Sequence, residues 1–183
     1  FRIAIGQKND SLKAVCHIGI GDYHNARRRY MMAHEHYIAA WQICRFTRDA
    51  LGEIRALINI SMINRHLRSH EKALSYLQKA RLLAEKRPDP LLEGRLNEQF
   101  ALVYQAMGDV ETSQHFFRQA LDRYQVAGNR SLAFRIRSDA GSLYLDEGRF
   151  EEALDYFRQL LREADTNDRD TYSALLTRIS QVY

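Results

Sequence analysis

The sequence predicts an all-α fold, a right-handed α-solenoid of stacked antiparallel helix pairs, and three observations support this prediction. A pattern of residues recurs every 40 positions, from Gly21 through Ser61 and Ala101 to Gly141. The chain has only two prolines and nine glycines, which favours helices. No alternation of apolar and polar residues persists, which argues against strands. A fixed period of roughly 20–50 residues is typical of proteins built from stacked supersecondary units.

We call a set of residues spaced by 40 positions a column. Three further columns predict how the two helices of each unit pack. Small residues occupy the first column, large apolar or aromatic residues the second, and mostly small residues the third. A small side chain lets two helices approach closely, and a large one fills the core between them. The columns are Ala33, Ala73, Ser113 and Ala153; Tyr37, Leu77, Phe117 and Phe157; and Ala40, Ala80, Ala120 and Leu160.

The third unit shows how each half of the repeat forms a helix. Apolar residues at helical spacing predict a first helix over Pro90–Met107. Gly108 tolerates a left-handed backbone and makes the turn, and Asp109 can cap the next helix. That second helix is expected from about Val110 to Val126, and Gly128 follows it as the next turn signal.

The period also divides the chain, which we expect to form one solenoid over residues 1–183. Four full repeats are expected at residues 9–48, 49–88, 89–128 and 129–168. Residues 1–8 are expected to be the tail of a preceding second helix, and residues 169–183 the first helix of a fifth unit. Neither end has the polar cap that solenoids need. We therefore expect either a segment of a longer protein or self-association through the ends.

Composition excludes several classes of partner and suggests a compartment. The net charge of +4, from 27 basic and 23 acidic residues, is too small to indicate nucleic acid by itself. No apolar run approaches the roughly 18 residues that span a membrane. Cys16 and Cys44 cannot form a disulfide scaffold for a chain of this length. Together with the lack of a signal-peptide pattern, this predicts a cytoplasmic protein.

The sequence carries no motif for catalysis, a cofactor or a metal. No nucleophile elbow, phosphate-binding glycine loop or zinc-protease signature is present, so we expect a protein that is not an enzyme and has no cofactor. His34 and His36 form the tightest histidine cluster, but residues two apart on a helix point to different faces. We therefore expect no metal site.

The pattern is strongest at Ala140–Tyr144, followed by Gly148, Phe150, Ala153 and Phe157. With these residues and the recurring columns, essentially the whole chain resembles the tetratricopeptide repeat (TPR) family. The common TPR period is 34 residues, and the 40-residue period here is similar to the subgroup of LGN/Pins, rapsyn and MalT-like solenoids. Within that subgroup, the stretch Gly52–Ile60 resembles the recurrent G-E-A-R-A-x-x-N-L sequence of LGN/Pins. Arg28 and Arg68 stand where the family usually has a turn glycine.

The resemblance implies that partners lie along a concave wall made by the first helix of each pair. One column on that wall is Arg55, Arg95 and Arg135, which predicts a ladder of arginines flanked by amides. Arginine binds carboxylates through two parallel hydrogen bonds, and amides can bind a peptide backbone. The expected groove residues are Arg55, Asn59, Met62, Arg65, Arg95, Glu98, Gln99, Gln105, Arg135, Ser138, Asp139 and Ser142.

Two interpretations of the arginine column stay open at this point. The arginines either bind a ligand or pair within the chain, for which the candidate acids are Glu53, Glu93, Glu98 and Asp139. The predicted function is a scaffold whose groove binds an extended, partly acidic peptide. The alternative is a sensor segment of a larger signalling protein or transcription regulator, switched by a peptide, a small ligand or self-association.

Overall fold

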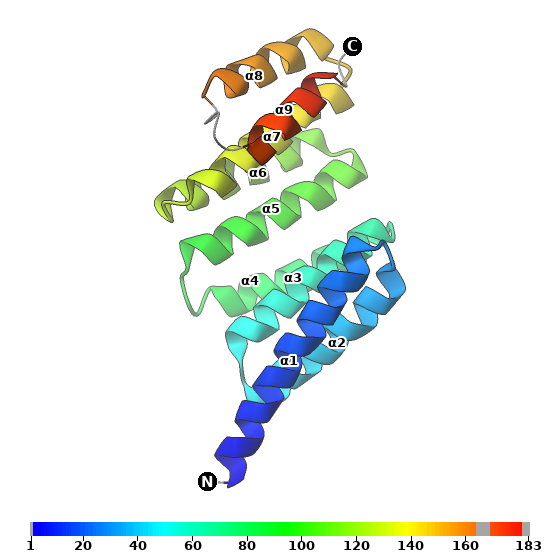
Figure 1. The fold of residues 1–183 in the computed structure, drawn as a ribbon, viewed down its shortest axis with the longest axis vertical. Coiled ribbons are helices and arrows are strands. Elements are labelled where there is room, and N and C mark those ends of the chain that lie inside the picture. Colours follow the sequence, from blue (N-terminus) through cyan, green and yellow to red (C-terminus); the bar gives the residue numbers. More distant parts are fainter. Residues whose placement is uncertain (1, 164–168, 181–183) are drawn as a thin grey trace.

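The computed structural model describes residues 2–163 and 169–180, and these residues form nine α-helices and no strand (Figure 1). None of the described helices is long and apolar enough to cross a bilayer. The helices are α1 (Arg2–Ala26), α2 (Tyr30–Thr47), α3 (Ala50–His66), α4 (His70–Ala84), α5 (Pro90–Met107), α6 (Val110–Val126), α7 (Arg130–Asp146), α8 (Phe150–Glu163) and α9 (Arg169–Ser180).

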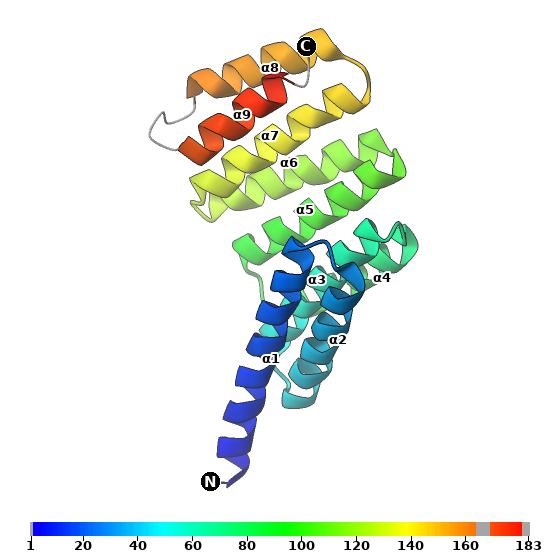
Figure 2. The same cartoon turned by 45° about the vertical axis from the view of Figure 1, so that its right-hand side comes forward.

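The helices stack along the long axis of the molecule, from α1 and α2 at one end to α8 at the other, with α9 beside α7 and α8 (Figures 1 and 2). Each odd-numbered helix from α1 to α7 packs against the even-numbered helix that follows it, and each even-numbered helix also packs against the next odd-numbered one. Odd-numbered helices contact one another as well, in the pairs α1–α3, α3–α5 and α7–α9. The predicted all-α solenoid of helix pairs is therefore confirmed.

The turns reveal that the 40-residue period consists of two halves of 20 residues. Residues spaced by 20 or 40 positions adopt the left-handed backbone that ends a helix, with φ between 57° and 81°; they are Arg28, Arg48, Arg68, Gly108, Gly128 and Gly148. The residue after each is positioned to cap the next helix. Asp49, Asp109 and Asn129 do so by accepting a hydrogen bond from the N–H three residues later. The predicted roles of Gly108 and Asp109 are thus confirmed.

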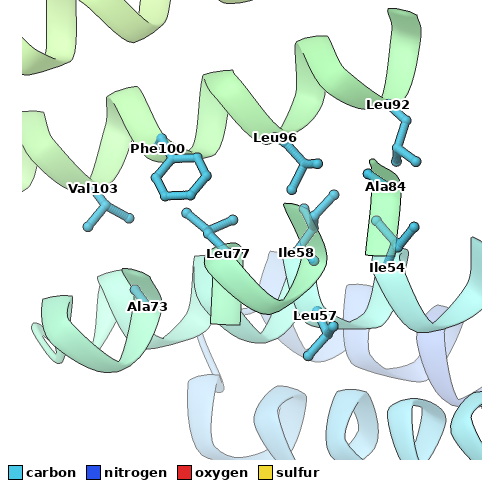
Figure 3. Close-up of a cluster of buried hydrophobic side chains, with 11 residues drawn as sticks. Ile54, Leu57, Ile58, Ala73, Leu77, Ala84, Leu92, Leu96, Phe100 and Val103 are labelled. Carbon is cyan, nitrogen blue, oxygen red and sulfur yellow. The ribbon is translucent and has the colours of Figure 1, made fainter. Parts of the chain in front are cut away.

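The predicted packing columns are buried between the helices of each pair. Every residue of the small and aromatic columns is at most 1% exposed. Ser113, the one polar member, donates its hydroxyl hydrogen to the carbonyl oxygen of Ala101 at 2.9 Å. Between consecutive pairs, Leu96 and Phe100 of α5 pack against Leu77 of α4 and Ile58 of α3 (Figure 3). The buried core of the second unit therefore extends into the third.

The beginning of the chain differs from the prediction. Residues 2–8 are not the tail of a separate helix, because α1 runs without a break from Arg2 to Ala26. Asp10 lies inside this helix and forms an ion pair of 2.9 Å with Lys13, one turn later. Asn129, the counterpart of Asn9 three repeats later, follows Gly128, whose left-handed backbone ends α6. Lys8 stands at the corresponding place before Asn9, and the helix continues through it. Figure 1 shows the first part of α1 extending beyond its neighbours.

Candidate functional site

The odd-numbered helices line a groove with a cavity of about 530 Å³. On α3 the lining residues follow at spacings of three and four, which places them on one face of the helix. The same spacing recurs on α5. The lining consists of Ile18 and Asp22 from α1; Arg55, Ile58, Asn59 and Met62 from α3; Arg95, Glu98 and Gln99 from α5; and Arg135 from α7.

The structure brings seven of the twelve predicted groove residues together in this cavity, and five lie outside its lining. The seven are Arg55, Asn59, Met62, Arg95, Glu98, Gln99 and Arg135. The prediction missed Ile58, Ile18 and Asp22. Ile18 and Asp22 precede Ile58 and Met62 by 40 positions and therefore occupy the same columns. Extending the columns into the first unit would have found them.

Arg55 and Arg95 carry positive charge into the cavity. Both side chains are exposed, and neither forms a hydrogen bond or an ion pair with the residues that the structure describes. Two acids that could have paired with them are engaged elsewhere. Glu53 accepts a hydrogen bond from the indole N–H of Trp41 at 3.1 Å, and Glu93 lies 3.5 Å from Arg123.

Arg135, the third member of the column, is paired within the chain. Its guanidinium donates two hydrogen bonds to the carboxylate of Glu98, at 2.8 and 2.9 Å. Glu98 is only 4% exposed and also accepts a hydrogen bond of 2.6 Å from the hydroxyl of Tyr124. The intramolecular interpretation therefore holds for Arg135 and not for Arg55 or Arg95 within the described chain.

The pKa values of this cluster follow from its burial and its charges. Burial acts to lower the pKa of Arg135, but the hydrogen bonds and the negative charge of Glu98 outweigh it, so the pKa is raised. Burial, then the charge of Glu98 and the hydrogen bond to it, raise the pKa of Tyr124. Arg135 thus stays charged and balances the charge of the buried Glu98 carboxylate, while Tyr124 stays neutral and donates a hydrogen bond to it.

Three of the remaining predicted residues belong to the structure of the last units rather than to the cavity. Asp139 accepts a hydrogen bond of 2.7 Å from Arg178 of α9, and burial raises its pKa despite that contact. The hydroxyl of Ser142 donates to the carbonyl oxygen of Asp139 at 2.6 Å, and Ser138 is buried. Arg178 was not predicted, because nothing in the sequence indicates its pairing with α7.

Arg65 and Gln105 lie further along α3 and α5, outside the cavity lining. Burial lowers the pKa of Arg65, and its buried Nε has no hydrogen-bond partner in the described structure. Gln105 donates to the carboxylate of Asp146 at 2.6 Å. Within the cavity, the buried Oε1 of Gln99 also lacks a partner among the described residues.

The first end of the groove has a negative charge that opposes the arginines. Asp22 accepts a hydrogen bond of 2.6 Å from the hydroxyl of Tyr37. Burial, followed by this hydrogen bond, raises the pKa of Tyr37. The groove is therefore polarised, with Asp22 on α1 and the two unpaired guanidinium groups on α3 and α5.

The histidines cluster differently from the sequence pattern. His36 contacts His17, with 3.0 Å between their Nδ1 atoms, and stacks on His24 with ring centroids 5.6 Å apart. Across the described ranges, no group of three or more His, Cys, Asp or Glu side chains is arranged to hold a metal ion.

Two family models match the chain, and both are described as tetratricopeptide repeat. One matches residues 92–162 and the other residues 54–86. No curated protein matches the sequence at a significant level.

Solved structures with the same fold include two Rap proteins and a protein named BtubC. BtubC (BKLC) from P. vanneervenii shares 14% identity at a TM-score of 0.69, over 89% of this chain and 68% of that one. A Rap protein complexed with Competence and Sporulation Factor shares 13% identity at a TM-score of 0.76, over 94% of this chain and 54% of that one. The Rap conjugation gene regulator of plasmid pLS20, in complex with the Phr* peptide, shares 21% identity at a TM-score of 0.69, over 91% of this chain and 49% of that one. The chain spans about half the length of these two Rap proteins.

Proposed function

We propose that this chain, which contains tetratricopeptide repeats, binds an extended protein segment in its groove through an acidic side chain held between Arg55 and Arg95. One observation carries the proposal. Both guanidinium groups are exposed, line the same cavity and form no hydrogen bond or ion pair with the described residues. An unpaired arginine in a concave site favours a carboxylate, because it can donate two parallel hydrogen bonds to it.

The other groove residues suit the backbone of such a segment. Asn59 and Gln99 offer both donors and acceptors to peptide groups, and Met62 offers an adaptable apolar contact. Arg135 adds no free charge, since Glu98 neutralises it. At the α1 end of the groove, the carboxylate of Asp22 would repel a second carboxylate of the ligand. The acidic residue of the ligand is therefore expected over α3 and α5. The two Rap structures described above contain a bound factor or peptide, which supports a peptide-binding use of the fold.

The experiment compares charge reversals inside and outside the groove. Fluorescein-labelled peptides of about 12 residues, with one central glutamate in otherwise neutral extended sequences, are titrated against the full chain. The double variant Arg55→Glu, Arg95→Glu should bind at least about tenfold more weakly, and the loss should shrink as salt is added. The matched control Arg48→Glu, Arg68→Glu changes the net charge equally at turns outside the cavity and should bind like wild type. Equal binding by the two double variants would contradict the proposal.

The predicted alternative, a sensor segment of a larger regulator, and the cytoplasmic location stay predictions. The same peptides would reach the same groove in either case, so the experiment tests the site and not the larger protein.

A further inference from the structure

Three equivalent hollows lie on the opposite side of the groove wall, between successive even-numbered helices. Each is floored by the first half of the odd-numbered helix between them. The first lies between α2 and α4, the second between α4 and α6, and the third between α6 and α8. Many of their lining residues are related by the 40-residue period, such as Trp41, Arg81 and Leu121. The hollows can therefore be compared position by position.

The second and third hollows are bridged by the chain's own ion pairs. In the second, Arg123 of α6 lies 3.5 Å from Glu93 of α5. In the third, Arg137 of α7 forms an ion pair of 2.6 Å with Glu163 of α8. Each pair links an even-numbered helix to the floor of its hollow.

The first hollow cannot form either bridge. Its residues at the corresponding positions are Glu53, Leu57 and Leu83, which contain no cation. Glu53 is already hydrogen-bonded to the indole of Trp41. Its cavity is about 670 Å³, with Trp41, Leu57, Leu82 and Leu83 as apolar lining residues, compared with about 250 Å³ for the second hollow and about 530 Å³ for the third. We call it the Trp41 hollow; it is lined by Trp41, Arg45, Glu53, Leu57, Lys79, Leu82, Leu83, Glu85 and Lys86.

The rim of the Trp41 hollow is positively charged. Arg45, Lys79 and Lys86 are exposed, and none of them forms an ion pair with a residue that the structure describes. Arg45 lies over the ring of Trp41 at 5.7 Å, and Lys79 over the ring of Tyr76 at 5.2 Å. Leu82, 62% exposed, adds apolar surface beside them.

We propose that the Trp41 hollow is a second protein-binding site, which takes a large apolar side chain from a partner segment whose neighbouring residues are acidic. Burying such a side chain against Trp41, Leu57 and Leu83 is favourable, and carboxylates on either side of it can pair with the three rim cations. Glu53 and Glu85 lie among the cations and would repel a continuous polyanion, whereas a short peptide can place its few carboxylates beside the cations alone. A peptide with one large apolar side chain between acidic residues fits the hollow better than nucleic acid or an anionic membrane.

The single tryptophan of the chain provides the readout, because it lines the hollow. The probes are four eight-residue peptides, each with Leu, Ile, Met or Phe at the centre and glutamates on both sides. We expect a saturable change in Trp41 emission with at least one of them, at concentrations up to about 1 mM. Replacing the central residue by alanine, or the glutamates by lysines, should abolish the change.

Leu83→Arg is the decisive variant, since it introduces the residue that the chain itself uses at position 123. The new guanidinium should pair with Glu53, as Arg123 pairs with Glu93, and should weaken peptide binding at least about tenfold. Lys79→Glu should also weaken it, whereas Gln119→Glu, the equivalent change in the second hollow, should not. Leu83→Met should retain binding.

Three results would overturn the proposal. The first is the absence of a saturable emission change with all four peptides. The second is a change that persists in Leu83→Arg. The third is a change that anionic phosphatidylglycerol vesicles produce and the peptides do not. The groove double variant Arg55→Glu, Arg95→Glu should leave this signal unaltered, so the two sites are tested independently.

Discussion

Glu98 in α5 and Arg135 in α7 are joined by two hydrogen bonds of 2.8 and 2.9 Å, although 37 residues separate them in the chain. This contact ties the third unit to the fourth across the groove. It also determines which arginines of the column remain open to a ligand. The positive charge available in the groove is therefore centred on Arg55 and Arg95.

Replacing Glu98 by glutamine should destabilise the protein. The variant removes the charge that two partners share in a buried site, so we expect the free energy of unfolding to fall by about 1–3 kcal/mol. Glu93→Gln is the control, because its ion pair with Arg123 is partly exposed and longer, at 3.5 Å. It should change stability by less than about 0.5 kcal/mol. Urea denaturation of both variants measures the difference, and equal effects would refute the structural role of Glu98.

Arg95→Ala and Arg135→Ala should separate stability from binding. Arg135→Ala leaves the buried carboxylate of Glu98 without its cation and should lower the free energy of unfolding by about 1–3 kcal/mol. Arg95→Ala removes an exposed side chain without an ion pair in the described chain and should change it by less than about 0.5 kcal/mol. Thermal and urea unfolding decide the matter; a large loss in Arg95→Ala would mean that this residue has a structural partner.

Gly94→Ala should be destabilising although alanine is the better helix former. A Cβ at position 94 would lie 2.7 Å from the ring of Tyr124, which the bond to Glu98 holds in place. We expect a loss of about 1–3 kcal/mol in the free energy of unfolding. At Gly19, a Cβ would meet nothing within 4 Å, so Gly19→Ala should stabilise by roughly 0.5–1 kcal/mol. Effects of the same sign would rule out this account of Gly94.

Arg68→Gly should stabilise the protein. Arg68 has a φ of 57°, a conformation that is strained for a residue with a Cβ. Relief of this strain stabilises the folded state, and the greater freedom of glycine in the unfolded chain offsets part of the gain. The free energy of unfolding should rise by roughly 0.5–1 kcal/mol. The reverse change, Gly108→Ala, should lower stability by about 1 kcal/mol, since the same backbone strain is then introduced where no neighbour is contacted. Paired denaturation curves for the two variants check both signs.

The stability of the protein should fall in mild acid through His66. Burial, followed by the charges of Arg65 and Arg28, lowers the pKa of His66 below its usual value of 6.5. The unfolded state therefore binds the proton more readily, so this contribution is complete above about pH 6.5 and is lost as the pH falls through the folded pKa. His66→Phe keeps an aromatic ring at the position that stacks on Tyr30 and removes the titration. Unfolding measured from pH 8 to pH 5 should show a smaller decline in the variant; an unchanged decline would assign it to other groups.

The sequence predicted the fold well because its signals act over short distances. The turn at Gly108 and Asp109 and the helix after it depend on residues within one 20-residue half-unit. The buried column that includes Tyr37 and Leu77 repeats the same local pattern. The beginning of the chain was the exception. Residues 1–8 were expected to end a separate helix, but residues 2–8 belong to α1, which no turn interrupts.

The candidate site was predicted in part. The columns led to Arg55 and Arg95, and they would have led to Asp22 if they had been extended into the first unit. The columns could not show that Arg135 is paired, because several acids lie near it in sequence. Only the packing of α5, α6 and α7 selects Glu98, which then also binds Tyr124.

The sequence by itself therefore determined the helices, their turns and the faces that they bury, since each depends on residues a few turns apart. The tertiary structure decided how charges pair across helices, which leaves Arg55 and Arg95 without a partner in the described chain. It also decided that the hollow beside Trp41 stays open while the next two are bridged. These outcomes depend on distances of a few ångströms between residues roughly 25–40 positions apart, and such distances follow from how the helices pack.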